Sequence, residues 1–200
     1  MTTTEPPASE AAPRNTRADA RRNRLRVLAA AQEAFEAEGI GVSVEAIARL
    51  AGVGVGTVYR HFPTKEALFE AIVLTNLEQF REQAQSLADA DDPGAALYGF
   101  LGQVIDQSET SMAIKDALNE SDFDGEAAAA ETFRELEAAV GHLLARAQAA
   151  GATRSDVTID ELFALIGTAC RASNTLRGGE VSARRLGSVI LDGLRPPAPR

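Results

Sequence analysis

Apolar residues recur every three to four positions along most of the chain, which is the spacing of amphipathic helices. No segment shows the strict alternation of a half-buried strand. We expect about nine helices, over residues 19–38, 44–51, 55–61, 64–88, 93–108, 112–118, 126–150, 158–177 and 182–195. Polar residues at 108–111 suggest the break between the fifth and sixth of these. The pattern therefore predicts an all-α fold.

The segment 42–68 predicts two short helices joined by a tight turn and followed at once by a longer helix. Ser43 is a good N-cap for the first short helix, and Gly52 suits the left-handed position that ends it. In the second short helix, Val58 and Phe62 would face inward. This spacing is that of a helix-turn-helix, whose second helix enters the major groove of DNA.

The residues left outside the second short helix have the chemistry of a DNA contact. They are Val55, Gly56, Thr57, Tyr59, Arg60 and His61. The hydroxyl and imidazole groups can bond phosphate oxygens, while Val55 and Gly56 leave room for a base edge or a thymine methyl. Lys65 adds a cation at the start of the next helix.

The run GVGVGTVYRHFPTKEALFEAI, which begins at Gly52, resembles the DNA-binding domain of the TetR/AcrR family of bacterial regulators, and the resemblance covers residues 24–72. It implies phosphate contacts from Ser43, Thr57, Tyr59, His61 and Lys65. It places Val55, Gly56 and Arg60 nearest the bases. Gly54, Val55 and Gly56 offer few hydrogen-bonding groups where several relatives read bases, so discrimination would rest more on Arg60, Thr57 and the N-terminal arm.

The charge distribution is compatible with DNA binding although the net charge is −9. Residues 1–75 hold nine basic and nine acidic residues, whereas residues 76–200 hold eleven basic and twenty acidic ones. Six arginines lie between Arg14 and Arg26, with Asp19 as the one acid among them. We favour a basic arm that reaches DNA for this group, with a solvated start of the first helix as the alternative.

The expected organisation is a disordered arm over 1–18, a helix-turn-helix domain over 19–63, an effector-binding and dimerisation domain over 64–195, and a flexible tail over 196–200. The helix from residue 64 would be a rigid link between the two domains. The single cysteine excludes an internal disulfide, and no apolar run has the ~20 residues of a membrane span. We therefore expect a cytoplasmic protein without a membrane partner.

Catalytic and metal sites find little support. The glycine-rich run at 52–57 lacks the lysine of a P-loop and follows a helix. The two histidines and Cys170 have no sequence partners that suggest a catalytic or zinc set. We expect no enzyme activity, no metal and no cofactor, although a helical enzyme that contains this hairpin is an alternative.

The family resemblance implies an effector cavity in the second domain. Its expected lining consists of large, soft or polar residues on apolar helix faces: Phe100, Val104, Met112, Phe123, Phe133, His142, Phe163 and Cys170. Each of them also suits ordinary core packing. His142 is the favoured contact, because a buried imidazole needs a hydrogen-bond partner that a ligand can supply. The apolar lining points to a small, largely hydrophobic effector.

The resemblance further implies that the last two helices pair with their copies in a second subunit. The expected interface consists of Leu162, Ile166, Ala169, Ser173, Leu186, Val189 and Ile190. Packing within one chain is the alternative. We interpret the chain as a dimeric, sequence-specific repressor that a small molecule releases from a near-palindromic DNA operator. Activation is a variant of this interpretation, and a helical scaffold that binds a partner protein without binding DNA specifically is its alternative.

Overall fold

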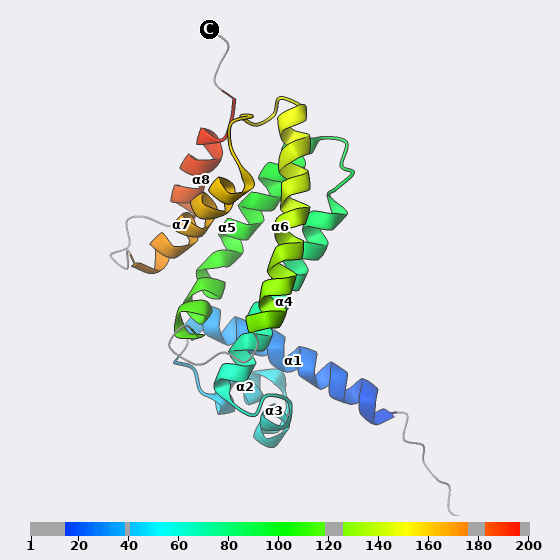
Figure 1. Ribbon diagram of the computed structural model, residues 1–200. Helices are drawn as coiled ribbons and strands as arrows, with labels where there is room; N and C mark the ends of the chain where they lie inside the picture. Colours follow the sequence, from blue (N-terminus) through cyan, green and yellow to red (C-terminus); the bar gives the residue numbers. More distant parts are fainter. Residues whose placement is uncertain (1–14, 39–40, 119–125, 176–182, 197–200) are drawn as a thin grey trace, which may run out of the picture.

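The structure is a computed structural model that describes residues 15–38, 41–118, 126–175 and 183–196; the side chains at 15–17, 36, 108–118, 126–128, 170–175 and 183 fall outside this description. Its eight helices, in chain order, are α1 Asn15–Glu38, α2 Val44–Ala51, α3 Val55–His61, α4 Lys65–Ser86, α5 Pro93–Leu118, α6 Glu126–Ala149, α7 Ile159–Thr175 and α8 Ala183–Gly193. The described residues contain no strand, which confirms the all-α prediction. Helices α1–α3 form a head at one end of a bundle made by α4–α8 (Figure 1).

Helix α5 is continuous where the sequence suggested a break, so eight described helices replace the expected nine. Residues 108–111 contain serine, glutamate and threonine but neither glycine nor proline. Polar residues of this kind lower helix propensity by only a fraction of a kilocalorie each, which is too little to end a long helix.

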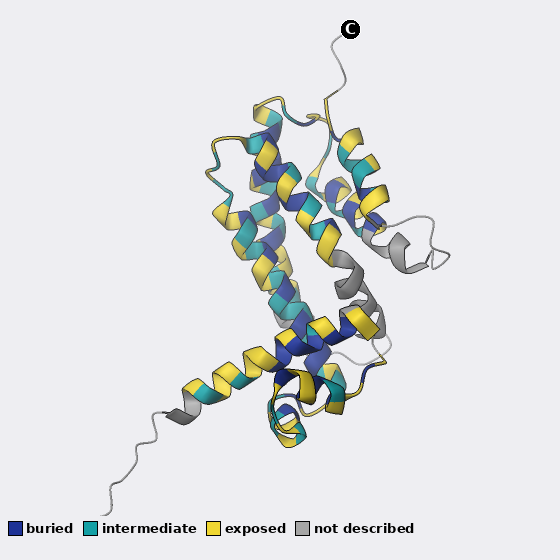
Figure 2. Ribbon diagram, turned by 180° about the vertical axis from the view of Figure 1, so that it is seen from behind, coloured by how far each residue is buried: buried dark blue, intermediate teal, exposed yellow. Residues whose placement is uncertain are grey.

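Helix α1 begins at Asn15, four residues before the expected start. The arginines from Arg17 to Arg26 therefore lie on a helix, which agrees with the alternative of a helix start, and their contact with DNA stays a prediction. Arginine and alanine, which dominate this stretch, are both strong helix formers. Residues 18–26 are largely exposed, and burial of α1 begins at Val27 (Figure 2).

Two separate hydrophobic cores hold the molecule together. The first joins α1–α3 to the beginning of α4, and includes Leu68, Phe69 and Ile72 of that helix. The second joins α4–α8, and includes Phe80 and Ala84 of α4. Because one unbroken helix contributes to both cores, α4 is a rigid connection between the head and the bundle.

Two arginines fix the bundle end of α4 to neighbouring groups. Arg81 of α4 lies 2.8 Å from the Glu135 carboxylate of α6, measured from Nη1 to Oε2. Arg146 of α6 donates to the backbone carbonyls of Ala88 and Ala90, the latter at 2.9 Å. These carbonyls follow the C-terminus of α4 and have no helical partner of their own, so the guanidinium satisfies them.

Helix α8 packs very close to α5. A Cβ built on Gly187 would lie 2.7 Å from side-chain atoms of Ile105, so only glycine fits at this crossing without movement of a neighbour. None of the helices in the described ranges is long and apolar enough to cross a membrane.

Candidate nucleic-acid interface

The turn between α2 and α3 follows from two residues at the ends of α2. The Ser43 hydroxyl accepts from the Ala46 amide at 3.1 Å and caps the start of the helix. Gly52 has φ of 64°, in the left-handed region, and the Val53 amide donates back to the Ala48 carbonyl at 3.0 Å. Both roles were predicted, and both are confirmed. Together they end α2 and redirect the chain into α3.

Helix α3 has the expected inward face. The Val58 side chain is 1% exposed and the Phe62 side chain 3% exposed, both in the core of the head. The opposite side leaves Gly56, Tyr59 and Arg60 exposed. The head therefore supports α3 from behind and presents its polar side to the exterior.

The remaining predicted contact residues lie on α3 or at the adjacent helix ends. Val55, Thr57 and His61 are half-buried on α3. Ser43 is exposed, but its hydroxyl also serves as the cap of α2. Lys65 is half-buried at the first position of α4, with its Nζ 5.6 Å from the centre of the Phe69 ring.

Two arginines of α1 lie against the helix-turn-helix, which the sequence reasoning missed. The Arg24 guanidinium sits over the Phe62 ring, 5.2 Å from its centre, and Arg26 Nη2 donates to the Gly52 carbonyl at 3.4 Å. A signal was available for Arg24, because it precedes the buried Leu28 and Ala31 at helical spacing. These contacts place two cations beside the end of α3 and the turn before it.

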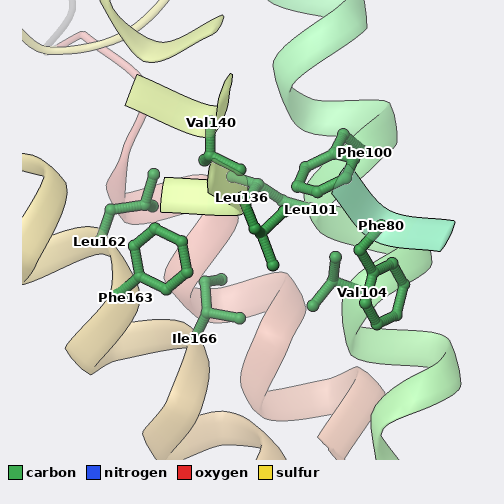
Figure 3. A pocket seen from close by; sticks show the side chains of 9 residues that line it. All are labelled: Phe80, Phe100, Leu101, Val104, Leu136, Val140, Leu162, Phe163 and Ile166. Carbon is green, nitrogen blue, oxygen red and sulfur yellow. The ribbon is translucent and has the colours of Figure 1, made fainter. Parts of the chain in front are cut away.

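The bundle contains an apolar cavity of about 50 Å³ between α4, α5, α6 and α7 (Figure 3). The expected Phe100, Val104 and Phe163 line it. The other walls, which were not predicted for the site, are Phe80, Leu101, Leu136, Val140, Leu162 and Ile166. All nine of these described lining residues are apolar.

The other predicted effector contacts lie elsewhere. Phe133 is 40% exposed and touches the Phe163 ring edge-on, with centres 5.3 Å apart, so it lies beside the cavity. The expectation of a buried His142 is wrong, because this residue is exposed on the outer side of α6, next to α4. Phe123 lies outside the described residues, as do the side chains of Met112 and Cys170.

Some of the residues predicted for the dimer interface are buried within the chain, and others are at least partly exposed. Leu162, Ile166 and Ala169 are buried within the chain, so the expectation that they lie on a free surface is wrong. Leu186 and Ile190 are half-buried, and the Ser173 side chain lies outside the description. Val189 is 56% exposed, and Leu165, which was not predicted, is 40% exposed. Among the described side chains of α7 and α8, the large apolar ones that are exposed are thus Leu165 and Val189.

Comparisons with known proteins match both parts of the chain. Residues 27–72 match the family of bacterial regulatory proteins named tetR, and residues 92–196 match the C-terminal domain of SbtR-like transcriptional regulators. The HTH-type transcriptional regulator UidR of Escherichia coli is 37% identical over 82 residues, which are 38% of this chain and 42% of that protein. The chain thus spans less than half the length of the curated relatives it matches.

Two solved structures resemble the whole molecule. A TetR transcription regulatory protein from Mycobacterium vanbaalenii is 40% identical, with a TM-score of 0.70 over 90% of this chain and 99% of that one. The regulator SCO0520 from Streptomyces coelicolor is 34% identical, with a TM-score of 0.67 over 88% of this chain and 99% of that one. The chain belongs to the TetR family of bacterial transcriptional regulators, with α1–α3 as its DNA-binding helix-turn-helix head.

Proposed function

We propose that the protein is a dimeric repressor that a small, apolar effector releases from a near-palindromic operator. The observation that carries this proposal is the arrangement around α4. Helix α4 begins close to α3, and its first turns belong to the core of the head. Further along, α4 belongs to the core of the bundle, where Phe80 lines the cavity. An effector in the cavity can therefore move the head without unfolding either core.

In this proposal α3 lies in the major groove of each half-site. Tyr59 and Arg60 are the exposed side chains of suitable length, and Gly56 allows close approach of the backbone. Thr57, His61, Lys65 and Ser43 contact phosphates around them. Arg24 and Arg26 add positive potential next to α3, which favours DNA over other partners despite the acidic bundle.

Dimerisation gives the two heads a fixed spacing. We place the interface on the outer face of α7 and α8, where Leu165 and Val189 expose large apolar side chains. A two-fold dimer reads two half-sites about 34–36 Å apart. A change in the spacing of the two heads therefore weakens the contacts with both half-sites at once.

The effector acts by preferring the released arrangement. For a hundredfold loss of operator occupancy, its affinity for that arrangement must exceed its affinity for the DNA-bound one by about 2.7 kcal/mol. The all-apolar walls select an uncharged molecule or group, because a charge buried there would have no partner.

Footprinting combined with a reporter tests this function. The protein should protect two blocks of DNA one helical turn apart on one side of the duplex, and deletion of its gene should raise expression from the protected promoter. Reduced expression on deletion would instead show an activator. Failure to protect any DNA, together with capture of a specific partner protein, would support the scaffold alternative.

A further inference from the structure

The cavity is too small, as it stands, for a molecule of ordinary effector size. Its volume of about 50 Å³ exceeds the ~10–15 Å³ that a cavity needs to hold one water molecule, but drug-sized ligands occupy pockets of about 300–1,000 Å³. A ligand larger than a few atoms therefore requires a wall to move. The wall that moves also determines which kind of molecule can enter the cavity.

Burial points to the wall formed by α7. Seven of the nine described lining residues are buried, and the two that are only half-buried are Val104 and Phe163. Val104 is short, so its displacement opens little space. The Phe163 ring is a large part of the wall, and Figure 3 shows it among the side chains that converge on the cavity.

The Phe163 ring is backed by Phe133, which is partly exposed to solvent. The Phe133 ring touches it edge-on, with centres 5.3 Å apart and an interplanar angle of 64°. Phe133 lies three and seven residues before Leu136 and Val140 of the cavity wall, so it continues the same stripe of α6 to the surface. Because the Phe133 residue is 40% exposed, solvent lies on the side towards which the ring would turn.

We propose that the Phe133–Phe163 ring pair is the gate through which an uncharged, apolar molecule enters this cavity between α6 and α7. The proposal rests on the proposed function, in which the same cavity holds the effector. When the pair separates, Phe163 leaves the wall and the cavity enlarges, with no polar group uncovered among its lining residues. A molecule with a carboxylate at the entering end would lose its hydration without gaining a partner.

Fluorobenzene and 4-fluorobenzoate are matched probes, because they share a ring and differ by one carboxylate. ¹⁹F NMR on the full-length protein reports both binding and exchange rates. We expect a saturable bound signal for fluorobenzene, and affinity for 4-fluorobenzoate lower by a factor of at least about 100. Equal affinity for the two probes, or no binding of fluorobenzene, would overturn the proposal.

Three variants separate a gate from a simple change in cavity size. Phe133→Ala removes a gate ring that does not line the cavity, so on- and off-rates should both rise about three- to tenfold while the Kd changes little. Val104→Ala enlarges the cavity away from the gate and should change mainly the Kd. Arg134→Ala, next to Phe133 in sequence, should leave rates and Kd unchanged. Unchanged rates in Phe133→Ala, or faster exchange in Val104→Ala alone, would place the entrance elsewhere.

DNA titrations with and without fluorobenzene keep the two proposals apart. If the probe binds with gated kinetics but operator affinity stays the same, the gate stands and release by an apolar effector fails. If the protein binds no operator at all, the regulatory proposal fails, and the NMR rates alone decide whether the gate exists.

Discussion

Gly52 ends α2 in a conformation that other residues adopt at a cost. Its φ of 64° is left-handed, and a Cβ there would lie 2.6 Å from Nη2 of Arg26. We predict that Gly52→Ala lowers the free energy of unfolding by at least about 1 kcal/mol, measured by urea denaturation. Gly56→Ala is the matched control, because this glycine lies within α3 with open space around it. That variant should be neutral or more stable by up to about 1 kcal/mol, and equal losses in both would contradict this account.

Substitutions of Lys65, Tyr59 and Arg60 in the proposed DNA interface should have different effects on DNA binding. Lys65→Ala removes one phosphate contact, so DNA affinity should fall for all sequences and the salt slope should decrease by about 1. Tyr59→Phe should lower the affinity for all DNA sequences by a similar factor. Arg60→Ala should also alter base preference, which a binding-site selection experiment measures. Arg134→Ala, a cation lost from the exposed surface of α6, is the control and should change none of these quantities.

Arg146 ties the C-terminal end of α4 to α6. Replacing it with methionine keeps much of the side-chain volume but leaves the Ala88 and Ala90 carbonyls without their charged donor. We predict a loss of about 1.5–3 kcal/mol in the free energy of unfolding. Arg195→Met, whose guanidinium lies over the Tyr98 ring and is largely exposed, should cost less. The reverse order would show that Arg146 does not hold α4.

The loop between α6 and α7 carries a pH-dependent pair. Arg154 donates to both carboxylate oxygens of Asp156, at 2.7 and 2.6 Å, and this hydrogen bonding lowers the pKa of Asp156 from 3.8 to about 2. The lowered pKa means that the pair stabilises the fold above pH 3.8 and loses this contribution as the pH falls towards 2. The stability difference between wild type and Asp156→Asn should therefore shrink across that interval. A difference that is independent of pH would contradict the pairing.

Local signals in the sequence predicted both ends of α2. The cap at Ser43 and the left-handed glycine at position 52 each depend on residues within a few positions of one another. The Thr158–Glu161 capping box at the start of α7 is a local signal of the same kind. In that box the Glu161 amide donates to the Thr158 hydroxyl and the Glu161 carboxylate accepts from the Thr158 amide. The inward face of α3 was likewise predictable, because Val58 and Phe62 are the apolar pair in a short polar helix.

The direction in which a longer helix faces was less predictable. Helix α7 is apolar on more than one side, with Leu162, Phe163, Leu165 and Ile166 in five consecutive positions. Its own sequence does not decide which of them face the bundle; packing against α5 and α8 does. The same reason explains why His142 was assigned to the interior although it lies on the outer side of α6.

At the scale of the whole molecule, the exposed faces of α7 and α8 should form the dimer. A double variant with Leu165→Glu and Val189→Glu places charges on that surface without touching the buried core. We predict a shift to monomer in sedimentation velocity and a loss of tight operator binding, with the helical content unchanged. The same change at Leu25, which is 54% exposed on α1, is the control and should leave the dimer intact. A persistent dimer would show that the subunits pair elsewhere.

A binding titration shows whether this TetR-family protein recognises one DNA sequence. The full-length protein is titrated at two salt concentrations against fragments that include the DNA flanking its own gene, with bulk genomic DNA as competitor. We predict saturable binding to one fragment, at least about 1,000-fold tighter than to bulk DNA, and retained at the higher salt. Weak binding to every fragment that disappears with salt would contradict this prediction, because charge alone would then explain the interaction.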